Sequence, residues 1–123
     1  MKPFLLLGLL MFANVAVAQS VADKEIAGLI DALARSGCEF ERNGNWYSAT
    51  RAKAHLSRKY AWLRKRDLAD TSEHFIERAA SNSSMSGKPY QVRCKGRPTL
   101  DSAAWFKAEL QRLRRQRMPS GKR

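Results

Sequence analysis

Apolar side chains recur at helical spacing in four separate stretches of the chain. In the first stretch, at about residues 23–35, the apolar side chains lie on one face of a predicted helix. They are Ile26, Leu29, Ile30 and Leu33. Gly37 follows as the left-handed residue that commonly ends a helix. The other stretches cover about residues 49–65, 72–81 and 102–117, each preceded by residues suited to cap a helix N-terminus: Ser48, Asp70 or Thr71, and Asp101. The pattern therefore predicts four helices.

Two shorter segments alternate in the manner of strands. The side chains of residues 38–42 are expected to point alternately to the two faces of a strand. Asn43-Gly44 follows and is the strongest short hairpin signal, because both central positions of that turn need a positive φ. Trp46 and Tyr47 follow on the returning strand, and residues 90–94 predict a further strand. Together with the helices, this predicts a mainly α fold with a short β-hairpin or small sheet, an α+β domain.

The N-terminus has the form of a secretion signal. Lys2 precedes an apolar run at residues 4–12, and the small-residue triplet at 16–18 stands before Gln19. An uncleaved membrane anchor is the alternative, but a span needs about 20 apolar residues and this run is interrupted at Asn14. We expect residues 1–18 to be a signal peptide cleaved after Ala18, and residues 19–123 to form a single small periplasmic domain.

Two cysteines and two histidines are candidates for a covalent staple or a metal site. In an oxidising compartment Cys38 and Cys94 have one intramolecular pairing, which would stabilise the fold by about 4 kcal/mol in the chain-entropy model. A zinc site would recruit His55 and His74 as well, but structural zinc ligands come in close pairs and these four residues are scattered. We expect a disulfide, no metal and no cofactor.

The charge balance is strongly basic. The chain carries 23 Lys and Arg against 11 Asp and Glu, a net charge of +12, and loss of Lys2 with the signal leaves 22 against 11. Such a domain attracts anionic polymers, acidic proteins and anionic surfaces. Export argues against nucleic acid as the partner and favours an anionic component of the envelope.

Basic residues also crowd the C-terminus. From about residue 112 the sequence predicts a basic tail without acidic partners, which suits the negative end of the helix dipole and provides an electrostatic arm. The alternative is a frayed, solvated terminus. The residues concerned are Arg112, Arg114, Arg115, Arg117, Lys122 and Arg123.

Helical spacing gives residues 49–65 two distinct faces. The face expected to be buried consists of Ala49, Ala52, Leu56, Tyr60 and Leu63. The opposite face carries Arg51, His55, Arg58, Trp62 and Lys65. Cations interleaved with an indole attract an anionic chain and stack on its rings or sugars, so this is a candidate contact surface. The alternative is an ordinary solvated helix face.

The polar stretch at residues 81–89 is a second candidate. It is not a P-loop, because no Gly stands five residues before Gly87 and Pro89 follows Lys88, and Met85 excludes a Ser-x-x-Lys motif. Its serines and backbone N–H groups could form a shallow anion nest. The alternative is a helix-to-strand connection whose serines satisfy its own backbone.

An ordered set of short motifs resembles the YfeK-like family of small proteobacterial proteins. The motifs are Arg-Asn-Gly at 42–44, His55-Leu56 with Lys59, and Ser-Gly-Lys-Pro-Tyr at 86–90. The resemblance covers residues 40–92 and implies an exported single domain of unknown activity, with no catalytic residues to carry over. The two cysteines are not part of the pattern, so the disulfide expectation depends on this sequence only.

The same motifs suggest a pocket. If the loop at 81–89 folds over the second helix, a cationic, hydroxyl-rich site for a carboxylate, phosphate or sulfate would form from His55, Lys59, Ser84, Ser86 and Lys88. Alternatively, these side chains only hold the loop against the helix.

Three functions remain open at this stage. The sequence favours a non-enzymatic basic binding or accessory module of the cell envelope. One alternative is an adaptor or inhibitor that docks an acidic protein. The other is a small hydrolase that uses Ser84 or Ser86 with His55 and Asp70, although no nucleophile elbow or suggestively paired carboxylates appear.

Overall fold

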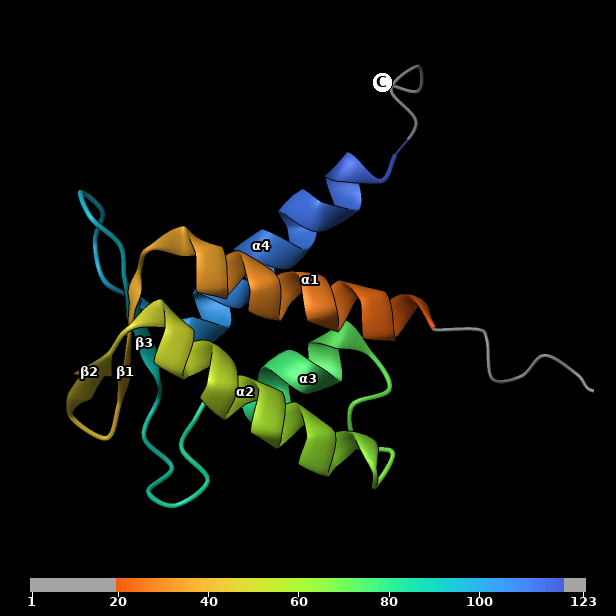
Figure 1. Ribbon diagram of the computed structural model, residues 1–123, viewed down its shortest axis with the longest axis horizontal. Coiled ribbons are helices and arrows are strands. Elements are labelled where there is room, and N and C mark those ends of the chain that lie inside the picture. The colour runs from red at the N-terminus through yellow and green to blue at the C-terminus, as the bar shows by residue number, and fades with distance from the viewer. Residues whose placement is uncertain (1–19, 119–123) are drawn as a thin grey trace, which may run out of the picture.

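All four predicted helices are present in the computed structural model, which describes residues 20–118 (Figure 1). They are α1 (Val21–Ser36), α2 (Ala49–Arg64), α3 (Ser72–Ala79) and α4 (Ser102–Gln116). The expected boundaries agree to within about two residues, the uncertainty usual for helix ends. Gly37 ends α1 in the left-handed region at φ 75°. The helices were predictable because their apolar spacing and terminal residues are local signals.

The strands form one small antiparallel sheet at one end of the helices (Figure 1). It contains β1 (Glu39–Arg42), β2 (Asn45–Tyr47), β3 (Gln91–Arg93) and β4 (Leu100–Asp101), in the order β2-β1-β3-β4. The hairpin turn has positive φ at both central residues, 52° at Asn43 and 88° at Gly44, as the sequence predicts. The sequence did not predict β4, because two residues are too few for an alternating pattern.

Side-chain caps hold three of the helix N-termini. Ser20, Ser48 and Thr71 each accept a hydrogen bond from the backbone N–H three residues later. Thr71 is thus the cap of α3. The Glu73 carboxylate in the first turn of this helix binds Arg114.

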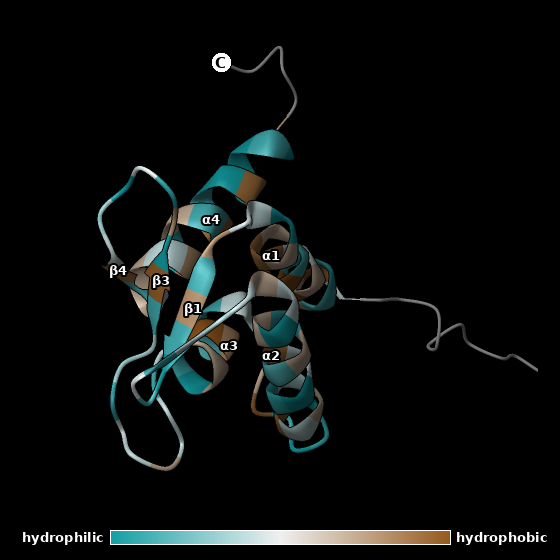
Figure 2. Cartoon of the chain, turned by 60° about the vertical axis from the view of Figure 1, so that its left-hand side comes forward, coloured by the Kyte–Doolittle hydropathy of each residue, from teal (hydrophilic) through white to brown (hydrophobic). Residues whose placement is uncertain are grey.

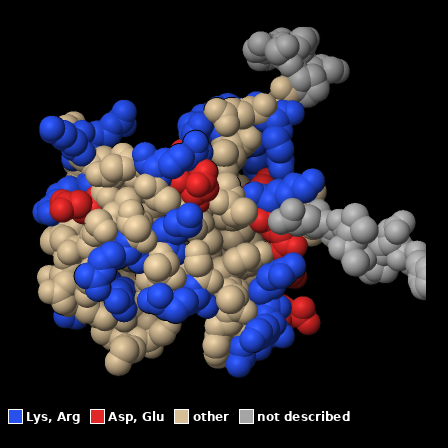
Figure 3. All heavy atoms as spheres, viewed as in Figure 1, with Lys and Arg blue, Asp and Glu red and all other residues tan. Residues whose placement is uncertain are grey.

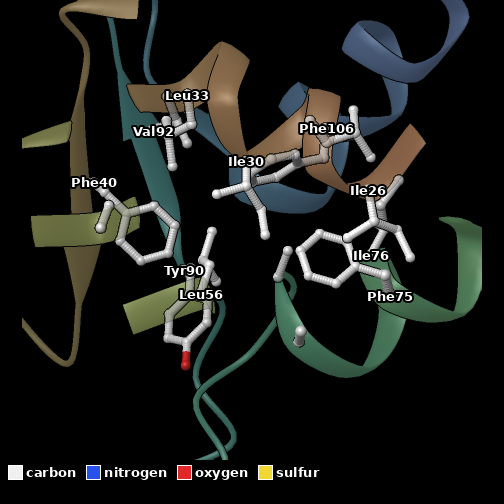
Figure 4. Close-up of a cluster of buried hydrophobic side chains, with 14 of the residues drawn as sticks. Ile26, Ile30, Leu33, Phe40, Leu56, Phe75, Ile76, Tyr90, Val92 and Phe106 are labelled. Atoms are coloured by element: carbon white, nitrogen blue, oxygen red, sulfur yellow. The ribbon is translucent and has the colours of Figure 1, made fainter. Parts of the chain in front are cut away.

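The core lies where the four helices meet one another and the inner face of the sheet. Figure 2 shows apolar positions at this junction, whereas α2 is hydrophilic along much of the side in view. Figure 4 shows the buried side chains meeting there, among them Ile26, Leu33, Phe40, Leu56, Phe75, Tyr90, Val92 and Phe106. Tyr60 was expected to be buried but is half-buried, because its hydroxyl reaches outward to donate to Asp23.

The predicted disulfide is confirmed. Cys38 follows α1 and Cys94 follows β3, and their sulfur atoms are bonded at 2.03 Å. The bond closes a loop over a sequence separation of 56 residues and staples the first half of the single domain to the second. This confirms a small α+β domain with one cystine.

The expectation that the C-terminal arginines have no acidic partner is wrong for three of them. Arg114 contacts Glu25 and Glu73, Arg117 contacts Glu25, and Arg112 contacts Glu109. The helix continues to Gln116 across most of the expected tail, so Arg114 and Arg117 reach acids on α1 and α3, whereas Arg112 pairs within α4 itself. Lys122 and Arg123 lie outside the described residues.

The expected signal peptide at residues 1–18 also lies outside the described residues. Within residues 20–118, no helix combines the length and the apolar character needed to cross a membrane.

Candidate functional site

A pocket of about 440 Å³ opens between α2, α3 and the loop that joins α3 to β3. Successive turns of α2 supply one wall, and the loop runs down the same side of the molecule (Figure 1). Residues three and four apart on a helix share a face, which is why one helix can supply most of the lining. The lining residues are His55, Arg58, Lys59, Trp62, Leu63, Arg78 and Ser84.

A hydrogen-bonded cluster fixes the inner end of this pocket. The Tyr90 hydroxyl lies 3.1 Å from Nε2 of His55 and accepts from Nζ of Lys59 at 3.0 Å. Lys59 also donates to the backbone carbonyl of Asn82 at 3.3 Å, which ties the loop to α2. Figure 4 shows the Tyr90 ring beside Phe40 and Leu56 with its hydroxyl directed out of the apolar cluster. The core therefore holds the tyrosine that positions both α2 side chains.

Burial and nearby cations set the protonation of this cluster. Desolvation, with Arg42, Lys59 and Arg58 nearby, lowers the pKa of His55 to about 4, so the imidazole is neutral at pH 7. Desolvation and Arg42 also lower the pKa of Lys59, and desolvation raises that of Tyr90. Because the Tyr90 hydroxyl oxygen accepts a hydrogen bond from Lys59, the O–H of Tyr90 can donate a hydrogen bond to Nε2 of His55. This arrangement suits the His55 tautomer that is protonated on Nδ1.

A second, smaller pocket adjoins the first and shares His55 and Arg58 with it. It has a volume of about 50 Å³ and is also lined by Phe40, Arg42, Tyr47, Arg51 and Ala52. The guanidinium groups of Arg42 and Arg51 lie over the Tyr47 ring, at 5.1 and 5.3 Å from its centroid. These contacts orient both arginines at the edge of the pocket.

The two pockets are lined by five cations and no carboxylate: Arg42, Arg51, Arg58, Lys59 and Arg78. Within residues 20–118, none of these five forms a salt bridge, whereas six other arginines do, at positions 35, 64, 93, 112, 114 and 117. Figure 3 shows Lys and Arg side chains gathered along the band that α2 occupies. An anion entering these pockets would meet cations that no acid already neutralises.

Three of the five predicted pocket residues meet here, and two do not. Ser84 lines the pocket together with His55 and Lys59. The Ser86 hydroxyl instead donates to Oδ1 of Asn43 at 2.6 Å and accepts from the backbone N–H of Lys88, whose side chain is exposed.

Hydrogen bonds within the protein use several of the polar groups of the loop at residues 81–89. The buried Ser83 hydroxyl accepts from the N–H groups of Met85 and Ser86 and from the Asn43 side chain. Several donors that an anion nest would need are thus used within the protein. The geometry favours the interpretation in which the serines satisfy their own backbone.

The predicted contact face lies on α2 and around its C-terminal end. Arg51, His55, Arg58 and Trp62 belong to the helix, and Lys65 is the residue that caps it. The Trp62 indole is 54% exposed. Arg66, which the sequence did not single out, stacks on it with its guanidinium carbon 3.8 Å from the ring centroid.

The residues suggested for a hydrolase do not assemble into a catalytic set. Asp70 contacts His74, with 2.5 Å between Oδ1 and Nδ1, and Nε2 of His55 faces Tyr90. Ser84 shares a pocket with His55 but forms no hydrogen bond with it. Within residues 20–118, no three His, Cys, Asp or Glu side chains are grouped so that they could hold a metal ion.

The comparisons with known proteins identify the family. Residues 20–114 match a family described as "Family of unknown function (DUF5329)". The chain belongs to this family. It is also 39% identical over 87 residues to a protein of Salmonella typhimurium named "Uncharacterized protein YfeK", an alignment that covers 70% of this chain and 68% of the relative. No solved structure matches the chain. The expected YfeK-like membership is confirmed, and the matched region contains both pockets.

Proposed function

We propose that this chain is an exported, non-enzymatic binding protein of the bacterial cell envelope, and that it holds an anionic ligand in the pocket on α2. The observation that carries the proposal is the charge of the pocket walls. Five cations line the two adjoining pockets without a salt bridge, in a domain where six other arginines are paired with acids. Cations gathered around a concavity without an acidic partner attract an anion to it.

The hydrogen bonds at the inner end of the pocket support this proposal. Lys59 is held by Tyr90 and Asn82, so two of its three N–H donors have partners and the third is left for a ligand. A side chain that is already ordered loses little conformational freedom when a ligand binds, which favours affinity. Neutral His55 provides a hydrogen-bonding group at the same place without adding charge.

Two features support the exported location. Residues 1–18 have the signal-peptide pattern, and the Cys38–Cys94 disulfide is of the kind that persists in oxidising compartments. The basic charge suits a partner among anionic envelope components.

Calorimetric titration of the chain starting at Gln19 with inorganic phosphate, and separately with sulfate, tests the pocket. We expect saturable binding that Arg58→Gln weakens about tenfold, since a hydrogen bond to a charged group contributes about 1.5–3 kcal/mol. Arg35→Gln is the matched control, because it removes the same charge from an exposed pair with Asp31 on α1. Equal weakening by both variants, or the lack of any saturable binding, would contradict the proposal.

A further inference from the structure

Building on the proposed function, we propose that the natural ligand joins its anionic group to a saccharide ring, and that this ring stacks on the indole of Trp62. The proposal concerns the outer half of the α2 pocket, beyond the anion subsite. It names the chemical class of the ligand, a sugar that carries a phosphate or carboxylate.

The indole of Trp62 is fixed in place with one surface available. Arg66 covers one face of the ring at 3.8 Å, and its guanidinium donates to the Trp62 carbonyl oxygen at 2.7 Å, which pins the pair at the end of α2. Arg66 does not line the pocket, whereas Trp62 does and remains 54% exposed. The stacked arginine therefore leaves the pocket side of the indole open to a ligand.

Cations lie next to this open surface on the same helix. Arg58 and Lys59 stand four and three residues before Trp62, which places all three on one side of α2. Arg78 joins them from α3, with its guanidinium held by a 2.9 Å hydrogen bond to the carbonyl of Leu68. One ligand can thus place its anion among these cations and a ring on the indole.

The uncharged polar groups of the pocket favour a sugar over an aromatic or alkyl group. The Ser84 hydroxyl and the neutral His55 imidazole offer donors and acceptors between the cations and the loop. Sugar hydroxyls can use such groups, whereas a phenyl ring or an alkyl chain would leave them without partners at a cost in free energy. The volume of about 440 Å³ lies in the range of small-molecule sites.

Three probes separate the parts of this proposal in the same calorimetric assay: glucose 6-phosphate, phenyl phosphate and inorganic phosphate. We expect glucose 6-phosphate to bind about tenfold more tightly than inorganic phosphate, a difference of about 1.4 kcal/mol, because the sugar ring buries apolar surface against the indole. Phenyl phosphate should fall between them. Trp62→Ala should remove the advantage of glucose 6-phosphate and leave the binding of inorganic phosphate unchanged.

Trp46→Ala is the matched control, because Trp46 lies on β2 with the Arg93 guanidinium stacked on it at 3.9 Å, away from the pocket. It should change none of the three affinities, and circular dichroism verifies that each variant is folded. If glucose 6-phosphate binds no more tightly than inorganic phosphate, the ring subsite is wrong and the anion pocket stands. Tighter binding of phenyl phosphate than of glucose 6-phosphate would overturn the saccharide assignment. If no probe binds, the proposed function itself fails.

Discussion

Replacing Arg114 by leucine should destabilise the domain far more than its place near the C-terminus suggests. The guanidinium donates to both carboxylate oxygens of Glu25, at 2.9 and 3.0 Å, and to Glu73 at 2.8 Å. Glu25 is only 6% exposed and also contacts Arg117 and the buried Ser72 hydroxyl. The cluster joins α1, α3 and α4, so its loss affects the packing of three helices.

The pKa of Glu25 gives the size of the expected loss in stability. The hydrogen bonds from Arg114 are the largest cause, and together with Ser72 and Arg117 they lower this pKa from 4.5 to about 2. They outweigh burial, which by itself would raise the pKa. At 1.36 kcal/mol per pKa unit, this favours the ionised form by about 3 kcal/mol in the folded state. Since Arg117 and Ser72 remain in the variant, we expect a loss of about 2–3 kcal/mol in the free energy of unfolding, from a total of about 5–15 kcal/mol for a typical domain.

Urea unfolding at pH 7, followed by circular dichroism, measures this difference. Arg112→Leu is the control: it removes the same charge from the same helix, but the half-exposed Arg112 pairs with Glu109 three residues earlier in α4 and this ion pair joins no second helix, so the cost should stay below about 1 kcal/mol. A lowered carboxyl pKa contributes stability above pH 4.5 that is lost as the pH falls through about 2. The difference in the free energy of unfolding between wild type and Arg114→Leu should therefore become smaller from pH 7 to pH 3. Equal costs for the two variants, or a gap that widens in acid, would refute this reasoning.

Three further predictions concern pH, export and the disulfide. Because the pKa of His55 is lowered to about 4, the unfolded chain gains a proton below pH 6.5 that the folded chain does not, so stability should fall between pH 6.5 and 4. The change should be about 2 kcal/mol after allowance for partial exposure of the ring, and His55→Gln should abolish it in urea titrations free of phosphate and sulfate. Mass spectrometry of the chain from a periplasmic extract should show Gln19 at the N-terminus and no free thiol. Cys38→Ser with Cys94→Ser should cost about 4 kcal/mol, and a loss below about 1 kcal/mol would contradict the chain-entropy argument.

Much of the fold was predictable because its signals are local. The apolar spacing of α1 and α2, the cap at Ser48 and the Asn43-Gly44 turn each depend on a few neighbouring residues. Pairing of Cys38 with Cys94 followed from there being two cysteines and a presumed oxidising compartment. By contrast, β4 has only two residues and exists because β3 lies beside it, which no periodicity can indicate.

The candidate site was predictable only in part. His55, Lys59 and Trp62 share a helix, so the sequence places them on one side of α2. Tyr90, Arg42 and Arg78 were missed as site residues, because their approach depends on how β3, β1 and α3 pack against that helix. The Ser-Gly-Lys-Pro-Tyr run did contain Tyr90, the one signal that pointed to it.

The sequence alone thus determined the helices, the hairpin, the cystine and the excess of positive charge, because propensity, turn geometry and composition belong to the chain itself. Only the tertiary structure decided which cations are neutralised. Packing of α4 against α1 brings Arg114 to Glu25, whereas the contact of α2 with the α3–β3 loop leaves Arg58 and Lys59 beside a pocket without a carboxylate. Ion pairs and pockets require atoms a few ångströms apart from distant parts of the chain, and that proximity exists only after folding.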